Sequence, residues 1–414
     1  MKCNWTTKKL SEIAYINPRE SLGKGVVAKK VPMDKLQPFC RDIPEFVLEE
    51  YKGGTKFRNG DTIMARITPC LENGKIAKVS VLKDGEVGFG STEYIVFREI
   101  DGVSDADFLY YLICSPLVRN LAIKSMVGSS GRQRVQTDVV ANLDIELPPI
   151  EEQRKIGGLL KTIDDKIELN NAINNNLEQQ AVLLFKKWFI EFDNSSKNML
   201  ETRFGLVPES FKLLKNGELP LVVTDYVANG SFASLKANVT LYQEPNYAYF
   251  IRNTDLKSGT FEVFVDEHSY NFLSKSTLYG GEIIISNVGD VGSVFLCPKL
   301  DKPMTLGNNI IMLRPEQENL RYYLYIWFKW LYGQSLIQGI KGGSAQPKFN
   351  KTDFKNLPIF LPPDDLLEQF HQIVKPMFEL IDENNTENQA LTRTRDTILP
   401  RLMSGELDVS DIEI

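Results

Sequence analysis

The stretch GSSGRQRV at residues 128–135 returns 214 residues later as GGSAQPKF at residues 342–349. A second pair follows at the same offset, because NLDIELPP at residues 142–149 returns as NLPIFLPP at residues 356–363. Upstream, YIVFR at residues 94–98 matches IIMLR at residues 310–314, and GDTI at residues 60–63 matches GEII at residues 281–284. The offset drifts there by a few residues, as loops of different length would cause. A repeat in this order predicts two related domains in one chain.

Each repeat begins with short apolar runs punctuated by glycine, which are typical of strands joined by turns. The expected strands cover residues 62–64, 76–81 and 94–97 in the first repeat and residues 261–265, 282–286 and 309–313 in the second. A helix is predicted at residues 105–115, with Ser104 as its cap, and its aromatic-rich counterpart at residues 319–331. Each repeat therefore predicts a mixed α/β domain.

After each Pro-Pro pair the spacing of apolar residues changes from two to seven, which is typical of a helical seam. The first helix is expected from Glu151 to about Asp193 and would be on the order of 50 to 60 Å long. Asparagines such as Asn170, Asn174 and Asn384 occupy some seam positions and would fix the register of a helix pair. The apolar seam residues are Ile156, Leu160, Ile163, Ile167, Leu177 and Leu184 in the first helix, and Ile373, Met377, Leu380, Leu391 and Ile398 in the second.

The simplest arrangement is an antiparallel coiled coil of the two helices. Alternatively, each seam packs on its own globular domain. The asparagine-rich run at residues 170–176 would be able to break the first helix, although the flanking heptads favour continuity. Pro376 should kink the second helix or mark a late start.

These patterns predict an α+β protein with a pseudo-two-fold internal repeat. Two mixed α/β domains are expected at residues 1–149 and 200–363. A first helical spacer is expected at residues 150–199, and a second spacer with a C-terminal tail at residues 364–414.

The amino-acid composition limits which classes of function the chain can have. The chain has 414 residues, of which 43% are hydrophobic and 25% charged, and its net charge is −6. The acidity gathers in residues 364–414, which hold twelve acidic and four basic residues, so the overall charge does not forbid DNA binding by the rest. No apolar run approaches the roughly 18 to 20 residues of a membrane span. We therefore expect a cytoplasmic protein.

Catalytic signatures are missing from the sequence. Five scattered cysteines and two histidines, His268 and His371, predict neither a disulfide framework nor a metal site. The chain has no phosphate-binding loop and no Asp/Asn-Pro-Pro-aromatic segment of an amino-methyltransferase. The acidic pairs at residues 164–165 and 364–365 are interpreted as solvated helix faces or helix N-termini. Catalysis in this chain is not expected.

The order of motifs resembles the specificity subunits of type I restriction–modification systems along the whole chain. The resemblance rests on LPPIEEQ at residues 147–153, FKKWFIEF at residues 185–192 and ILPRLMSGEL at residues 398–407. VPESF at residues 207–211 resembles the opening of a second recognition domain, although tryptophan is more usual than Phe211. LPPDDLLEQ at residues 361–369 departs from the pattern by an insertion, so the resemblance does not define where the second helix starts.

The resemblance implies a non-catalytic protein that binds double-stranded DNA with a bipartite site. One domain would read each half-site, and the helices would act as a ruler that sets the unread spacer. Two modification subunits would supply S-adenosylmethionine and adenine methylation, and restriction subunits would supply ATP hydrolysis with Mg²⁺ and cleavage. No cofactor is then expected on this chain. The acidic last segment suits a surface that faces protein, and solubility explains it about as well.

Candidate DNA-binding residues lie in the glycine-serine loops and in the hairpins before them. Small residues let backbone N–H groups approach phosphates, while Arg, Gln and Lys side chains reach base edges. The competing interpretation is a plain surface turn with solvated charges. The first domain's candidates are Ser129, Ser130, Arg132, Gln133 and Arg134 in the loop and Arg66, Asn73 and Lys75 around the hairpin; the second domain's are Lys341, Ser344, Gln346 and Lys348 in the loop and Asn287 and Ser293 before it.

Two other function classes compete with this interpretation. A coiled-coil scaffold would bind protein partners with its globular ends and would read no DNA. An autonomous DNA-modifying enzyme would act alone with S-adenosylmethionine, and the missing motifs argue against it.

Overall fold

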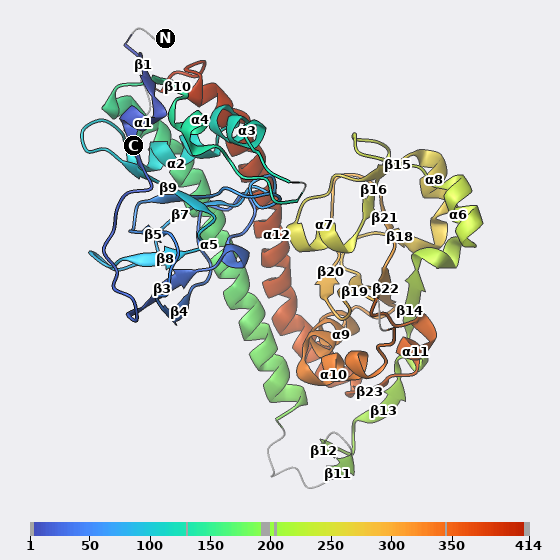
Figure 1. Ribbon diagram of the computed structural model, residues 1–414. Helices are drawn as coiled ribbons and strands as arrows, with labels where there is room; N and C mark the ends of the chain where they lie inside the picture. Colours follow the sequence, from blue (N-terminus) through green and yellow to red (C-terminus); the bar gives the residue numbers. More distant parts are fainter. Residues whose placement is uncertain (1–3, 130, 192–198, 203–204, 344–345, 410–414) are drawn as a thin grey trace. The chain divides into compact units, whose positions relative to one another are not determined.

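The computed structural model describes residues 4–129, 131–191, 199–202, 205–343 and 346–409 (Figure 1). The chain forms two compact units. The first comprises Met1–Ala172 with Asn385–Ile414, and the second comprises Ile173–Asn384. The border between the units crosses two long helices, α5 (Ile150–Phe189) and α12 (Asp364–Met403). The four-segment division expected above stays a prediction.

The first unit contains two four-stranded sheets. One has the antiparallel order β2 (Ala14–Ile16), β9 (Tyr94–Glu99), β6 (Thr62–Ala65), β7 (Ile76–Lys78). The other has the order β4 (Val47–Glu50), β3 (Val27–Val31), β8 (Gly88–Gly90), β5 (Lys56–Phe57), in which β3 and β8 are parallel. A separate ribbon pairs β1 (Thr6–Lys9) with β10 (Asp144–Leu147). The short helices are α1 (Leu10–Ile13), η1 (Met33–Lys35), α2 (Ala106–Cys114), α3 (Pro116–Lys124) and α4 (Thr137–Ala141).

The second unit repeats this plan with additions. Its first sheet has the order β14 (Leu221–Asp225), β22 (Ile310–Pro315), β19 (Ile283–Ser286), β20 (Val294–Leu296). Its second sheet has the order β15 (Leu241–Tyr242), β17 (Phe264–Val265), β16 (Ala248–Ile251), β21 (Met304–Leu306), β18 (Thr277–Leu278), in which β16 and β21 are parallel. The ribbon is β13 (Lys212–Lys215) with β23 (Pro358–Leu361). The predicted internal repeat is confirmed.

The remaining elements of the second unit are short. A hairpin joins β11 (Met199–Thr202) to β12 (Gly205–Pro208). The helices α9 (Leu320–Lys329), α10 (Leu331–Gly339) and α11 (Lys351–Lys355) correspond to α2, α3 and α4. The additional helices are η2 (Asn216–Glu218), η3 (Tyr226–Asn229), α6 (Phe232–Asn238), α7 (Asn253–Ser258), α8 (Glu267–Phe272) and η4 (Ser274–Ser276).

An ion pair between an arginine and a carboxylate occurs at equivalent positions of the repeat in both units. Arg98 on β9 donates from Nε and Nη2 to the two oxygens of Asp61, at 2.6 and 2.7 Å. Arg314 on β22 lies 3.0 Å from Glu282. Both carboxylates are buried, with Asp61 at 1% and Glu282 at 3% exposure, so each needs its arginine to offset the loss of water. The repeat thus preserves a buried charge pair as well as strand order.

The helices α5 and α12 are 40 residues each, which corresponds to roughly 60 Å. Within the first unit, Arg395 and Asn388 of α12 bond to Asp164 and Asn170 of α5. Within the second unit, Asn384 of α12 bonds to Asn174 of α5. Residue numbers fall along one helix as they rise along the other, so the pairing is antiparallel (Figure 1). The predicted antiparallel helix pair is confirmed.

The helices also pack on the globular parts, so the two arrangements considered from the sequence coexist. Ile156 and Leu160 are fully buried in the first unit's core together with α2. Ile373 and Leu380, expected in the seam, are 42% and 40% exposed. The buried row of this part of α12 is instead Leu367, Phe370, Val374 and Phe378, which packs in the second unit's core. The other predicted seam residues, Ile163, Ile167, Leu177, Leu184, Met377, Leu391 and Ile398, are partly buried.

The preferred continuous first helix is confirmed, because the asparagine-rich run does not break α5. The second helix, α12, begins at Asp364 and continues through Pro376, so the late start considered at Pro376 is wrong. Pro376 is exposed, which lets water satisfy the carbonyl that its missing N–H leaves unpaired. Asp105, not Ser104, caps α2 by accepting from the backbone N–H groups of Asp107 and Phe108. The helix expected to reach Leu331 ends at Lys329, where α10 follows. The expected end of the first spacer helix, Asp193, lies outside the described residues.

Candidate nucleic-acid interface

The first unit's glycine-serine loop is closed by a backbone bridge between Val127 and Arg134. The N–H of Val127 donates to the Arg134 carbonyl at 3.0 Å, and the N–H of Arg134 donates to the Val127 carbonyl at 2.9 Å. Gly128 has φ +135°, and a Cβ there would lie 2.9 Å from the Arg132 carbonyl oxygen. Glycine is therefore required where the loop turns out of the bridge.

This loop is fastened to the turn after β6. The N–H of Thr68 donates to the carbonyl of Gln133 at 3.0 Å, and the N–H of Val135 donates to the carbonyl of Arg66 at 2.8 Å. Arg66 and Arg134 were predicted separately, in a hairpin and in a loop. The backbone bonds bring them together.

The second unit builds the same frame from different residues. Lys348 and Gly342 exchange backbone hydrogen bonds of 2.9 and 2.8 Å. The N–H of Gly289 donates to the Pro347 carbonyl at 2.8 Å, and the N–H of Phe349 donates to the Asn287 carbonyl at 3.0 Å. The candidates Asn287 and Lys348 are therefore joined in the same way as Arg66 and Arg134.

Glu93 is the acidic partner of the first unit's arginines. Arg134 donates from Nε to both Glu93 oxygens at 3.0 Å and from Nη2 to one of them at 2.7 Å. Arg66 Nε lies 3.5 Å from the same carboxylate. The hydrogen bond from Arg134 holds the pKa of the Glu93 carboxyl below its ordinary value, against the opposing effect of burial. Glu93 was missed from the sequence, although it directly precedes the repeated YIVFR strand.

Some of the other candidate side chains have hydrogen-bond partners within the protein, and others are exposed. Arg132 is exposed, and within residues 4–129, 131–191, 199–202, 205–343 and 346–409 its side chain makes no ion pair or hydrogen bond. Lys75 Nζ donates to the Met33 carbonyl at 2.8 Å. The Ser293 hydroxyl donates to Asp290 at 2.5 Å. Exposed positions are Ser129, Asn73, Lys341, Gln346 and Lys348, Gln133 is partly buried, and Ser130 and Ser344 lie outside the described residues.

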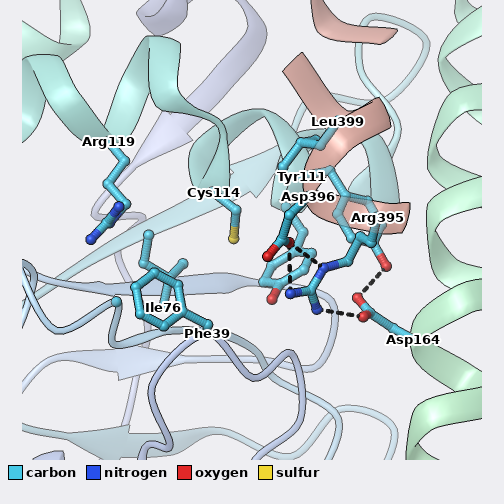
Figure 2. Close-up of a pocket in the computed structure, with 11 residues that line it drawn as sticks. Phe39, Ile76, Tyr111, Cys114, Arg119, Asp164, Arg395, Asp396 and Leu399 are labelled. Carbon is cyan, nitrogen blue, oxygen red and sulfur yellow. Dashed lines mark hydrogen bonds and ion pairs between the residues drawn. The ribbon is translucent and has the colours of Figure 1, made fainter. Parts of the chain in front are cut away.

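A second polar cluster, in the first unit, contains the acidic pair that was expected to be solvated. Asp164 of α5 is 3% exposed, and it accepts from Arg395 of α12 at 2.7 Å and from the Tyr111 hydroxyl at 2.7 Å. Figure 2 shows Arg395 pointing toward Asp164 beside Tyr111 and Cys114. The solvated-face interpretation is therefore wrong for Asp164. It holds for Asp364 and Asp365, which are exposed in the first turn of α12.

The cavity beside this cluster is about 60 Å³, which is room for a few waters at most. Burial raises the pKa of the Cys114 thiol to about 12, so the thiol stays protonated at neutral pH and is a poor nucleophile. Asp164 and Arg395 are paired with each other. The cluster holds α5, α12 and α2 together within the first unit.

Two further searches bear on function. Across the part of the chain that the structure describes, no group of three or more His, Cys, Asp or Glu side chains is placed to hold a metal ion. No described helix is both long enough and apolar enough to span a bilayer.

Known proteins match most of the length of the chain. A family model described as the type I restriction modification DNA specificity domain matches residues 3–179 and 224–393. A type I restriction enzyme specificity subunit of Methanocaldococcus jannaschii is 27% identical over 326 residues, which cover 76% of this chain and 73% of the relative. A type I restriction enzyme specificity subunit of Haemophilus influenzae is 25% identical over 408 residues, covering 84% and 87%.

A solved structure agrees in fold. The crystal structure of a type I restriction-modification system S subunit from M. genitalium has a TM-score of 0.55 at 15% identity, over 96% of each chain. The two matched segments of the family model cover most of the first half and most of the second half of the sequence. They coincide with the internal repeat.

Proposed function

The chain belongs to the DNA specificity subunits of type I restriction–modification systems, and from this premise we propose that it reads a DNA site in two halves, one with each unit. Its family members are non-catalytic parts of a larger enzyme. The observation that carries the proposal is found in both units: backbone hydrogen bonds join the glycine-containing loop to the turn that follows β6 in the first unit and β19 in the second. We call this arrangement the frame. In each case the frame joins candidate readers, Arg66 with Arg134 and Asn287 with Lys348.

The helix pair would act as the ruler between half-sites. Support for this role is that both helices have 40 residues and are paired within each unit, through side-chain amides in both and an ion pair in the first. Four base pairs of B-DNA span about 14 Å, so a rod of roughly 60 Å is long enough to cover a spacer of several base pairs.

Partner subunits would supply the chemistry. We place S-adenosylmethionine and adenine methylation on two modification subunits, and ATP, Mg²⁺ and cleavage on restriction subunits, in the cytoplasm. With a net charge of −6, this chain has a weak sequence-blind attraction for DNA, so tight binding would need the positive surfaces of its partners.

The test is to co-express the chain with its modification subunit and to map methylated adenines across a host genome. We expect a bipartite motif with two fixed half-sites and an invariant spacer. Contiguous or scattered methylation would contradict the proposal. Absence of any DNA shift by the assembled complex would favour the scaffold considered from the sequence.

A further inference from the structure

Three positions occupy equivalent places in the two units. Arg66, Glu93 and Arg134 of the first unit correspond to Asn287, Asn309 and Lys348 of the second. The N–H of residue 66 donates to the carbonyl of residue 93 at 2.9 Å, and the N–H of residue 287 donates to the carbonyl of residue 309 at 3.1 Å. Isolated bridges then join Ile67 to Arg134 and Val288 to Lys348. The backbone hydrogen bonds and bridges are shared, whereas the side chains differ, and Asn309 has a positive φ that Glu93 does not have.

In the first unit, the Glu93 carboxylate accepts hydrogen bonds from the Nε–Nη2 edge of Arg134 and lies 3.5 Å from Nε of Arg66. The bidentate pair fixes the plane of Arg134, because the guanidinium fork and the carboxylate are both planar. Arg66 Nε is buried and has no hydrogen-bond partner among the described residues. All three side chains remain partly exposed, with Glu93 at 23%, Arg66 at 33% and Arg134 at 43%.

A carboxylate is out of place on a surface that only grips phosphates, because it repels them. It is suited to a surface that reads base edges, where the direction of each donor matters more than net charge. The two arginines and Glu93 carry a combined charge of +1, and their donors are held in a fixed orientation.

The second unit has no carboxylate at the aligned position. Asn309 has φ +65°, a left-handed conformation that asparagine adopts more readily than most residues. Asn287 donates from Nδ2 to the Phe349 carbonyl at 3.3 Å, while its buried Oδ1 has no hydrogen-bond partner among the described residues. Among the described residues, the aligned position therefore has a buried polar atom without a hydrogen bond in both units: Asn287 Oδ1 in one, and in the other Arg66 Nε, which lies 3.5 Å from the Glu93 carboxylate.

We propose that Glu93 is a positioning residue that holds Arg134 and Arg66 as a preformed reader of one G·C pair in the first unit's half-site. Arginine donors match the O6 and N7 acceptors of guanine in the major groove, which makes guanine the base this pair recognises. The inference rests on the proposed function and deepens it. Asn287 occupies the aligned position in the second unit, so that unit serves as an internal control.

The experiment uses the full chain with Glu93→Gln, co-expressed with the modification subunit, and genome-wide mapping of methylated adenines. Glutamine keeps the size of the side chain but removes the charge that orients Arg134. We expect one G·C position in one half-site to become degenerate, with discrimination falling roughly tenfold to a hundredfold. The other half-site and the spacer length should stay as in the wild type.

Two further variants sharpen the test. Arg134→Lys keeps the positive charge but removes the planar guanidinium, so it should reduce base discrimination at the same position of the motif. If Glu93→Gln does not assemble with the modification subunit, Arg134→Lys provides the test instead. Asn309→Asp introduces a carboxylate at the aligned position of the second unit, and it should alter only the other half-site.

An unchanged motif at wild-type occupancy in Glu93→Gln would overturn the proposal. So would a uniform loss of methylation at every site by an assembled complex, since that result indicates a structural role without base discrimination. A wild-type complex that shows no bipartite motif would instead defeat the proposed function, so the two failures are distinguishable.

Discussion

Nδ2 of Asn170 on α5 donates a hydrogen bond of 2.9 Å to Oδ1 of Asn388 on α12. Asn170 is fully buried; its Nδ2 also donates to Glu387 of α12 at 2.7 Å, and its Oδ1 accepts from Lys166 of α5 at 3.0 Å. The relation returns in the second unit, where Nδ2 of Asn384 donates to Oδ1 of Asn174 at 2.8 Å. The two pairs are related by the 214-residue repeat. Matched polar pairs of this kind fix the register of packed helices.

Replacing one member of the first pair should destabilise the protein. In Asn170→Leu, Asn388 loses a partner that the apolar side chain cannot replace, and we expect the free energy of unfolding to fall by about 1 to 3 kcal/mol. Adding Asn388→Leu should recover part of this loss, because both members of the pair are then apolar, while Glu387 still loses the Asn170 donor. Urea unfolding of the wild type, the two single variants and the double variant measures the free energy of unfolding for this double-mutant cycle. The control is Asn175→Leu, at an exposed position of the same helix. Strictly additive effects of the two substitutions would contradict this account.

The buried Asp164–Arg395 pair should be sensitive to the loss of one partner. The side chains are 5% and 11% exposed, so Arg395→Met leaves a buried carboxylate without its cation. We expect a loss of about 3 to 5 kcal/mol in the free energy of unfolding. Asp164→Asn combined with Arg395→Met should be less damaging than Arg395→Met alone. Arg393→Met, at an exposed position of α12, is the matched control, and an equal effect of both arginine substitutions would refute the prediction.

Stability should depend on pH through His371. Burial lowers the pKa of His371 below its ordinary value of 6.5, and the ring is stacked on Tyr322 at 5.4 Å. The unfolded chain binds the proton more readily than the folded chain. The stabilisation is therefore complete above pH 6.5, and it declines as the pH falls from there to the folded-state pKa. One group contributes a slope of at most about 1.4 kcal/mol per pH unit.

His371→Phe keeps an aromatic ring against Tyr322 and removes the titrating group. Its free energy of unfolding should fall less steeply between pH 7 and pH 5 than that of the wild type. The other histidine, exposed His268, supplies the control variant His268→Gln, which should retain the wild-type slope. Identical slopes for His371→Phe and the wild type would rule this contribution out.

The duplicated architecture could be predicted because the repeat preserves what local structure depends on. The glycine-containing loop and the Pro-Pro pair return at one offset of 214 residues, and the apolar runs return in the same order. Strands, loops and helices could therefore be assigned in order. The helices were predicted from their heptads, but the exposure of Ile373 and Leu380 was not. A heptad assumes one partner helix, whereas this part of α12 also packs on the second unit's core.

The side-chain partners of charged residues could not be predicted from the sequence. Asp164 was interpreted as solvated because its partner Arg395 is 231 residues away, and charge patterns show only near neighbours along a helix. The hydrogen bond from the candidate Lys75 to the carbonyl of Met33, 42 residues away, likewise has no sequence signal. Arg66 and Arg134 were both named, yet Glu93 between them was missed, because a carboxylate next to a predicted DNA surface is recognised as a partner only in three dimensions.

The central claim is that paired helices hold two DNA readers at a set separation. The most direct measurement is the spacer length of the methylated motif after four residues are inserted into both helices, between Ala172 and Ile173 and between Asn384 and Asn385, where the border between the units crosses them. Four helical residues add about 6 Å, so the spacer should lengthen by one or two base pairs of about 3.4 Å each while both half-sites stay unchanged. A complex that assembles and methylates with the original spacer length would contradict the claim.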